Sequence, residues 1–173
     1  MKAMIVIDMQ NDFTTGVLGN AECAAVIEPV ADAIRRFRQE NPDGILIATL
    51  DTHTEDYMNT QEGRKLPVPH CIKPAEGWQL CPEIKAALGN DCTLLEKGTF
   101  GAVNLPQVIG EAPEEITLLG VCTDICVISN AMIVKAAFPE TTVKVIADCC
   151  AGVTPQSHNT ALDAMKMCQI EII

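Results

Sequence analysis

Short apolar runs recur along this chain, and segments with helical spacing separate them. Strands are predicted over 4–7, 45–50, 92–95, 116–119, 142–147 and 169–172, and helices over 24–37, 83–88, 105–109, 124–138 and 156–167. The run 45–50 is of the type found when both faces of a parallel sheet are covered. This alternation predicts an α/β fold of three layers, with a mainly parallel central sheet of about six strands and helices on both faces.

The composition agrees with this fold class. The chain has 173 residues, of which 48% are hydrophobic and only 3% aromatic. A core built from aliphatic side chains is typical of a sheet covered by helices, and the length is that of one domain, so we expect residues 1–173 to form a single domain.

Charge and cysteine usage exclude several classes of protein. A net charge of -11 disfavours binding to nucleic acid or to an anionic membrane, which leaves a small molecule as the expected partner. No apolar run approaches the roughly 20 residues of a membrane-spanning helix, and residues 1–10 lack a secretory signal. The nine cysteines are odd in number. We therefore expect reduced thiols and a cytoplasmic location.

Reactive side chains stand at the ends of the predicted strands. Asp8, Asp51 and Lys97 follow the first three strands, and Cys126 lies just beyond the fourth, where the next helix begins. Ligands of open parallel sheets bind outside the carboxyl ends of the strands. These four residues therefore predict one site at that edge of the sheet.

The residue types indicate nucleophilic catalysis. Cys126 is placed in the first turn of a helix, where free N–H groups and the helix dipole favour a thiolate. Asp8 would accept the thiol proton, Lys97 would lower the pKa of the thiol, and backbone N–H groups of the turn would hold an oxyanion. In the alternative interpretation Cys126 is a buried core residue and Asp8 and Lys97 form an ordinary salt bridge.

Three motifs carry a resemblance to a known family. They are IVIDMQNDF at 5–13, KGTFGA at 97–102 and GVCTDICV at 120–127. The chain resembles the isochorismatase-like cysteine hydrolases, whose best-known members are nicotinamidases. The resemblance implies that fold, a catalytic triad of Asp8, Lys97 and Cys126, and an acyl-thioester route from a small carboxamide to a carboxylate and ammonia. It also implies a cis peptide before Cys122, whose N–H would join that of Cys126 in the oxyanion hole.

The segment 51–78 holds a second group of reactive side chains. Asp51 and His53 form D-x-H, and Glu62 and His70 follow. Such ligands suit Zn, Fe or Mn, and the resemblance implies a divalent metal held by these four residues, with Glu62 the loosest match. In the alternative interpretation, both histidines are loop residues that cap backbone groups. No organic cofactor is expected.

The scarcity of aromatic residues bears on the substrate. Stacking on a pyridine ring falls to Phe13 and Phe100, which are the predicted pocket residues. A nicotinamide-like amide is the expected substrate. The rivals are a metal-free amidase of the same family acting on carbamoyl or ureido compounds, and a redox or binding module that uses Cys122 and Cys126 as a thiol pair.

Two further expectations concern the surface. The segment 126–138 carries Lys135 as its only charge, so it is either buried in the domain or covered by a second subunit, and a homo-oligomer is predicted. His158, on the last predicted helix, is assigned to the surface.

Overall fold

The central element is a six-stranded parallel sheet. The computed structural model describes residues 1–173. The strand order is β3-β2-β1-β4-β5-β6, and every neighbouring pair is parallel. The strands are β1 (Lys2–Ile7), β2 (Ile45–Asp51), β3 (Thr93–Lys97), β4 (Glu115–Val121), β5 (Thr142–Ala151) and β6 (Glu171–Ile172). The predicted α/β architecture is confirmed.

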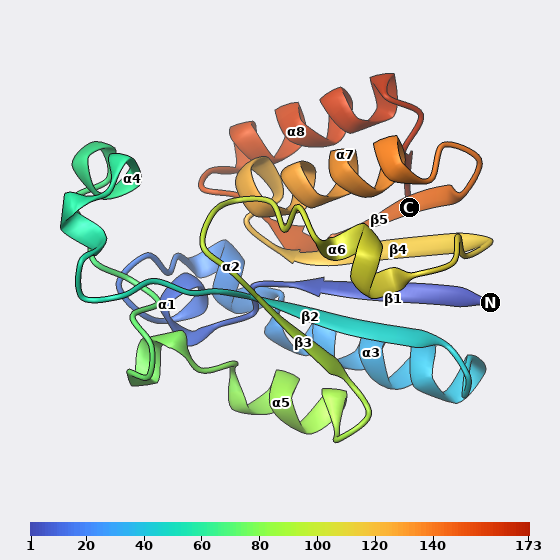
Figure 1. Ribbon diagram of the computed structural model, residues 1–173, viewed down its shortest axis with the longest axis horizontal. Helices are drawn as coiled ribbons and strands as arrows, with labels where there is room; N and C mark the ends of the chain where they lie inside the picture. The colour runs from blue at the N-terminus through green and yellow to red at the C-terminus, as the bar shows by residue number, and fades with distance from the viewer.

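Helices cover both faces of this sheet. They are α1 (Asn11–Thr14), α2 (Ala21–Ala25), α3 (Ile27–Glu40), α4 (Gln61–Lys65), α5 (Pro82–Leu88), α6 (Leu105–Ile109), α7 (Ile128–Ala137) and α8 (Pro155–Met167). Figure 1 shows α3 and α5 on one face and α6, α7 and α8 on the other. The central strand β1 is buried from Ala3 to Ile7, as expected for a strand covered on both sides.

The structure corrects three details of the predicted elements. The predicted helix 24–37 is two helices, α2 and α3, which meet at Val26. The strand β5 runs on to Ala151, four residues beyond its predicted end at 147, because it continues to pair with β4 past an irregularity in the ladder. The helix α7 is preceded by a separate turn of π-helix, Thr123–Val127.

The segment 51–78 lies outside the predicted helices and strands, yet it contains local structure. Turns of 3₁₀-helix form at Tyr57–Asn59 and Glu76–Trp78, and α4 lies between them with its first turn capped by the Thr60 side chain. Figure 1 shows α4 at the left, beyond the carboxyl ends of β1 and β2. The segment therefore lies over the edge of the sheet where a ligand is expected.

The helices of the chain are all too short or too polar to span a lipid bilayer.

Gly120 is a position where the close approach of two central strands requires glycine. Its φ is +121°, and a Cβ atom there would lie 2.2 Å from the carbonyl oxygen of Ile7 on β1. Gly110 also has a positive φ, of +81°, but a Cβ atom there would meet nothing within 4 Å. At both positions the backbone conformation would strain a residue that has a side chain, but the space around the two glycines differs.

We predict that Gly120→Ala lowers the free energy of unfolding by about 3 kcal/mol or more, because strain and a backbone clash add. Gly110→Ala is the matched control and should cost about 1 kcal/mol through strain alone. Urea denaturation followed by circular dichroism measures both. Equal losses in the two variants would contradict this explanation.

Candidate active site

The Lys97 ammonium lies close to the other predicted catalytic residues. The Lys97 side chain is 2% exposed, and its Nζ lies 2.7 Å from Asp8 Oδ2. The same atom lies 3.6 Å from Cys126 Sγ and donates to Asp51 Oδ1 at 3.3 Å. The structure thus brings together all four strand-end residues that the sequence placed at one site.

Cys126 is presented by the turn Thr123–Val127, which joins β4 to α7. The carbonyl oxygen of Cys122 accepts N–H groups from Ile125 and Val127 at 3.1 and 3.0 Å. Asn130, on α7, donates its side-chain amide to the Cys126 carbonyl at 2.8 Å. The peptide between Val121 and Cys122 is cis, as the resemblance implied.

Burial has the largest effect on the pKa of the Cys126 thiol. Burial raises the pKa of this thiol well above its ordinary value, the negative charge of Asp8 raises it further, and only Lys97 opposes them. The expectation that the start of a helix favours a resting thiolate is therefore wrong for this site. A thiol with a raised pKa holds its proton more firmly, so it can act as a nucleophile only together with a proton acceptor.

Asp8 is the residue predicted to accept the thiol proton. The residue is fully buried, and its φ is +46°. Thr49 on β2 donates its hydroxyl to Asp8 Oδ1 at 2.6 Å. Burial raises the Asp8 pKa, while Lys97 and the Thr49 hydroxyl oppose that rise. Thr49 was missed as a site residue, although it is the one hydroxyl in the apolar run 45–50.

The second predicted group forms a compact cluster next to Lys97. Ligand atoms of Asp51, His53 and His70 all lie within 4.8 Å of one another. The Nε2 atoms of His53 and His70 are 2.9 and 3.4 Å from Asp51 Oδ2, and each is 3.7 Å from Glu62 Oε1. His53 Nε2 is buried without a hydrogen-bond partner. An unpaired ring nitrogen that faces carboxylate oxygens is what a bound cation requires.

The charge balance also fits a divalent cation. Asp8, Asp51 and Glu62 contribute three negative charges, and Lys97 contributes one positive charge, which leaves an excess of two negative charges when the histidines are neutral. Burial alone raises the pKa of Asp51, but the two neighbouring imidazoles and the Lys97 charge lower it overall, so this carboxylate stays ionised.

Neighbouring groups orient the cluster. Gln10, just after β1, accepts the Asp51 N–H at 2.8 Å and donates to the Asp51 carbonyl at 2.9 Å. His70 Nδ1 donates to the Val68 carbonyl at 2.8 Å, which leaves Nε2 to face Asp51. The buried Tyr57 ring lies edge-on to the rings of His53 and His70 at 4.8 and 5.0 Å. The sequence did not indicate Gln10 or Tyr57 as site residues, because their contacts with the cluster form only in the folded chain.

A cavity of about 230 Å³ adjoins both groups and is lined by Cys126, Asp51 and His70. Its apolar walls come from Phe13, Leu18, Leu66, Phe100, Ile125 and Val153. The two predicted pocket residues are both at this cavity. Phe13 is buried beside His70, and Phe100 is 46% exposed at the mouth.

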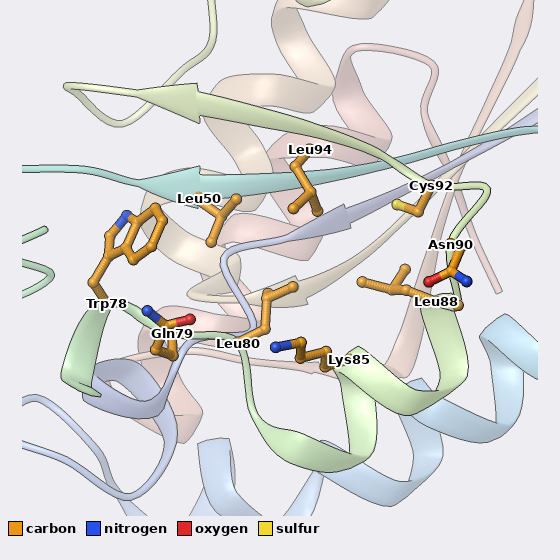
Figure 2. A pocket seen from close by; sticks show the side chains of 10 residues that line it. Leu50, Trp78, Gln79, Leu80, Lys85, Leu88, Asn90, Cys92 and Leu94 are labelled. Carbon is orange, nitrogen blue, oxygen red and sulfur yellow. The ribbon is translucent and has the colours of Figure 1, made fainter. Parts of the chain in front are cut away.

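Trp78 belongs to a different cleft. Figure 2 shows it with Leu50, Leu80 and Leu94 between the strands β2 and β3 and the helix α5. Its indole N–H donates to the Thr52 hydroxyl at 2.9 Å. Trp78 therefore packs against neighbouring loop residues, and it is absent from the lining of the 230 Å³ cavity.

The chain is similar to known proteins over its whole length. The family model of the isochorismatase domain matches residues 2–173. An uncharacterized isochorismatase family protein, PncA, of Bacillus subtilis is 32% identical over 76% of each chain. The nicotinamidase/pyrazinamidase of Mycobacterium tuberculosis is 24% identical over 100% of this chain and 98% of that protein.

Solved structures agree with these matches. The pyrazinamidase of Pyrococcus horikoshii in complex with zinc superposes with a TM-score of 0.84 at 25% identity, over 99% of this chain and 98% of that one. With the family model spanning the chain, the fold and the sequence lead to one conclusion: the chain belongs to the isochorismatase family.

Proposed function

We propose that this protein is a cysteine amidohydrolase that converts a small, nicotinamide-like carboxamide into a carboxylate and ammonia. One observation carries the proposal: Cys126, with Lys97 3.6 Å from its sulfur, lines the same cavity of about 230 Å³ as Asp51, Glu62 and His70. Relatives named as nicotinamidases and pyrazinamidases support an amide-hydrolysing enzyme.

The proposed chemistry proceeds through an acyl-thioester. Asp8 accepts the proton of the Cys126 thiol as the sulfur attacks the amide carbon. The C–N bond then breaks, Asp8 returns the proton to the leaving nitrogen, and ammonia departs. Water attacks the thioester, which releases the carboxylate and restores the thiol. Backbone N–H groups of Cys122 and Cys126 would hold the oxyanion, each worth about 3 to 4 kcal/mol by analogy with other acyl-transfer enzymes.

Lys97 has two roles in this scheme. Its ammonium lies 2.7 Å from Asp8 and 3.6 Å from the sulfur, so it stabilises the negative charge on whichever of the two carries it. Burial opposes a charged ammonium, but Asp8, Cys126 and Asp51 together raise the Lys97 pKa above its ordinary value. The ammonium therefore stays protonated throughout.

Asp51, His53 and His70, with the Glu62 carboxylate as a fourth ligand, would hold a divalent metal such as Zn, Fe or Mn. When bound, the metal would supply an open coordination position for the ring nitrogen of a pyridine carboxamide. The aromatic ring of Phe13, 5.4 Å from that of His70, is placed to contact such a ring.

We predict that Cys126→Ala lowers kcat for ammonia release from nicotinamide by about 10⁴-fold or more, because no other group can form the thioester. Cys168→Ala changes an exposed thiol and is the matched control, with activity unchanged. Pyrazinamide and N-carbamoyl amino acids are assayed alongside. Substantial turnover by the Cys126→Ala variant would rule out the nucleophile, and turnover of carbamoyl compounds alone would favour the rival amidase.

We predict that the purified protein contains about one divalent ion per chain, and that chelation or His53→Ala lowers nicotinamide hydrolysis about 10- to 100-fold or more. Adding Zn²⁺ back should restore the chelated wild type. Glu55→Ala, an exposed carboxylate in the same segment, is the control. Elemental analysis with the ammonia assay measures both quantities. Full activity in metal-free protein would favour the metal-free rival.

The raised pKa of Asp8 predicts the acid limb of the pH profile. Asp8 must be ionised to accept the thiol proton, so kcat/KM should fall as pH falls through its pKa, above the ordinary value near 3.9. Thr49→Val removes a donor to the charged form and should move this limb to higher pH by about one unit. Thr93→Val, on the exposed start of β3, should leave it in place. If the acid limb of the Thr49→Val variant stays in place or moves to lower pH, the assignment of Asp8 as the base is contradicted.

A further inference from the structure

His158 contacts the turn that carries the nucleophile. It lies on α8, only partly exposed, and its Nδ1 is 2.7 Å from the hydroxyl of Thr123. Thr123 is fully buried and is the first residue of the turn Thr123–Val127. The assignment of His158 to the surface is therefore incomplete, because one edge of its ring is bonded inside the protein.

The next residue of the turn is held by the same part of the chain. Both carboxylate oxygens of Asp124 accept the Val153 N–H at 3.2 Å. A Cβ atom at Gly152 would lie 3.0 Å from His158 and 3.1 Å from Asp124, so glycine permits this close approach. Two consecutive residues of the nucleophile turn are thus fixed by the connection from β5 to α8.

That connection is itself firmly anchored. Thr154 and Ser157 form a reciprocal capping box at the start of α8. The Asn20 side chain, which caps α2, donates to the Gly152 carbonyl at 3.2 Å. His158 therefore projects from a fixed helix terminus toward Thr123, the first residue of a turn whose later carbonyls at Ile125 and Cys126 accept side-chain bonds from α7.

We propose that His158 is a positioning residue for the amidase reaction: through the Thr123 hydroxyl it fixes the turn that presents the Cys126 thiol and the oxyanion-binding N–H groups. This inference rests on the proposed function. His158 is not among the residues that line the substrate cavity, so it acts through Thr123 and not by touching the substrate.

Loss of this hydrogen bond should affect the transition state more than substrate binding. Oxyanion stabilisation depends steeply on donor position, and small misplacements cost up to about 10²-fold in rate. The cavity walls do not include His158 or Thr123. We therefore expect kcat to fall about 10- to 100-fold in variants that lose the bond, with KM changed less than about threefold.

The test is a double-mutant cycle with a rescue variant, measured as kcat and KM for ammonia release. His158→Phe keeps a ring without nitrogen, and Thr123→Val keeps the shape of threonine without its hydroxyl. The double variant should be no slower than the slower single variant, because both lose one bond. His158→Asn can place a polar atom near the position of Nδ1 and should recover kcat to within about threefold of wild type. Asn159→Ala, the exposed neighbour on α8, is the control.

The outcomes separate this inference from the proposed function. Unchanged kcat in His158→Phe, a loss confined to KM, multiplying losses in the double variant or no recovery in His158→Asn would each overturn the positioning role. Thermal unfolding of each variant identifies a failure to fold, in which case Thr123→Val alone decides by its kcat. If wild-type protein cleaves none of the amides, the proposed function fails and this inference fails with it.

Discussion

The Lys97 ammonium lies between two buried carboxylates, 2.7 Å from Asp8 and 3.3 Å from Asp51, with 2% of its side chain exposed. A buried charge is stable only when paired, and here each partner needs the other. Asp8 is the proposed base for Cys126, and Asp51 belongs to the candidate metal cluster. One cation therefore joins the ends of β1, β2 and β3, and it gives the nucleophile and the metal cluster a common electrostatic environment.

The same burial explains why the proposed mechanism includes a general base. A thiol at a helix start in water would lose its proton easily, but Cys126 lies where desolvation raises its pKa well above the ordinary value. In the proposed reaction the thiol proton moves to Asp8. Thr49 donates a hydrogen bond to one oxygen of that carboxylate and Lys97 forms an ion pair with the other, so neighbouring groups set both its orientation and its pKa.

Much of this arrangement could be predicted from the sequence, because parallel strands bring their carboxyl ends to one edge of a sheet. That rule places Asp8, Asp51 and Lys97 together from the sequence alone. What escaped prediction depends on contacts between distant segments. The Gln10 side chain bonds the backbone of Asp51, 41 residues away, and His158 bonds Thr123, 35 residues away. The raised pKa of the Cys126 thiol was not predicted either, because the position of a residue in a helix can be read from the sequence, whereas its burial depends on the whole fold.

Homo-oligomerisation stays a prediction. The helix α7 already packs against α6 and α8 of its own chain.

The central claim is that Cys126 carries the substrate's acyl group during turnover. Rapid acid quenching of wild-type protein during nicotinamide hydrolysis, followed by peptide mass spectrometry, tests it most directly. The account predicts a nicotinoyl group on the peptide that contains Cys126, appearing before steady-state ammonia release and lost on incubation at alkaline pH. Ammonia release with no acylated Cys126 peptide at any quench time, or with the acyl group on another residue, would contradict it.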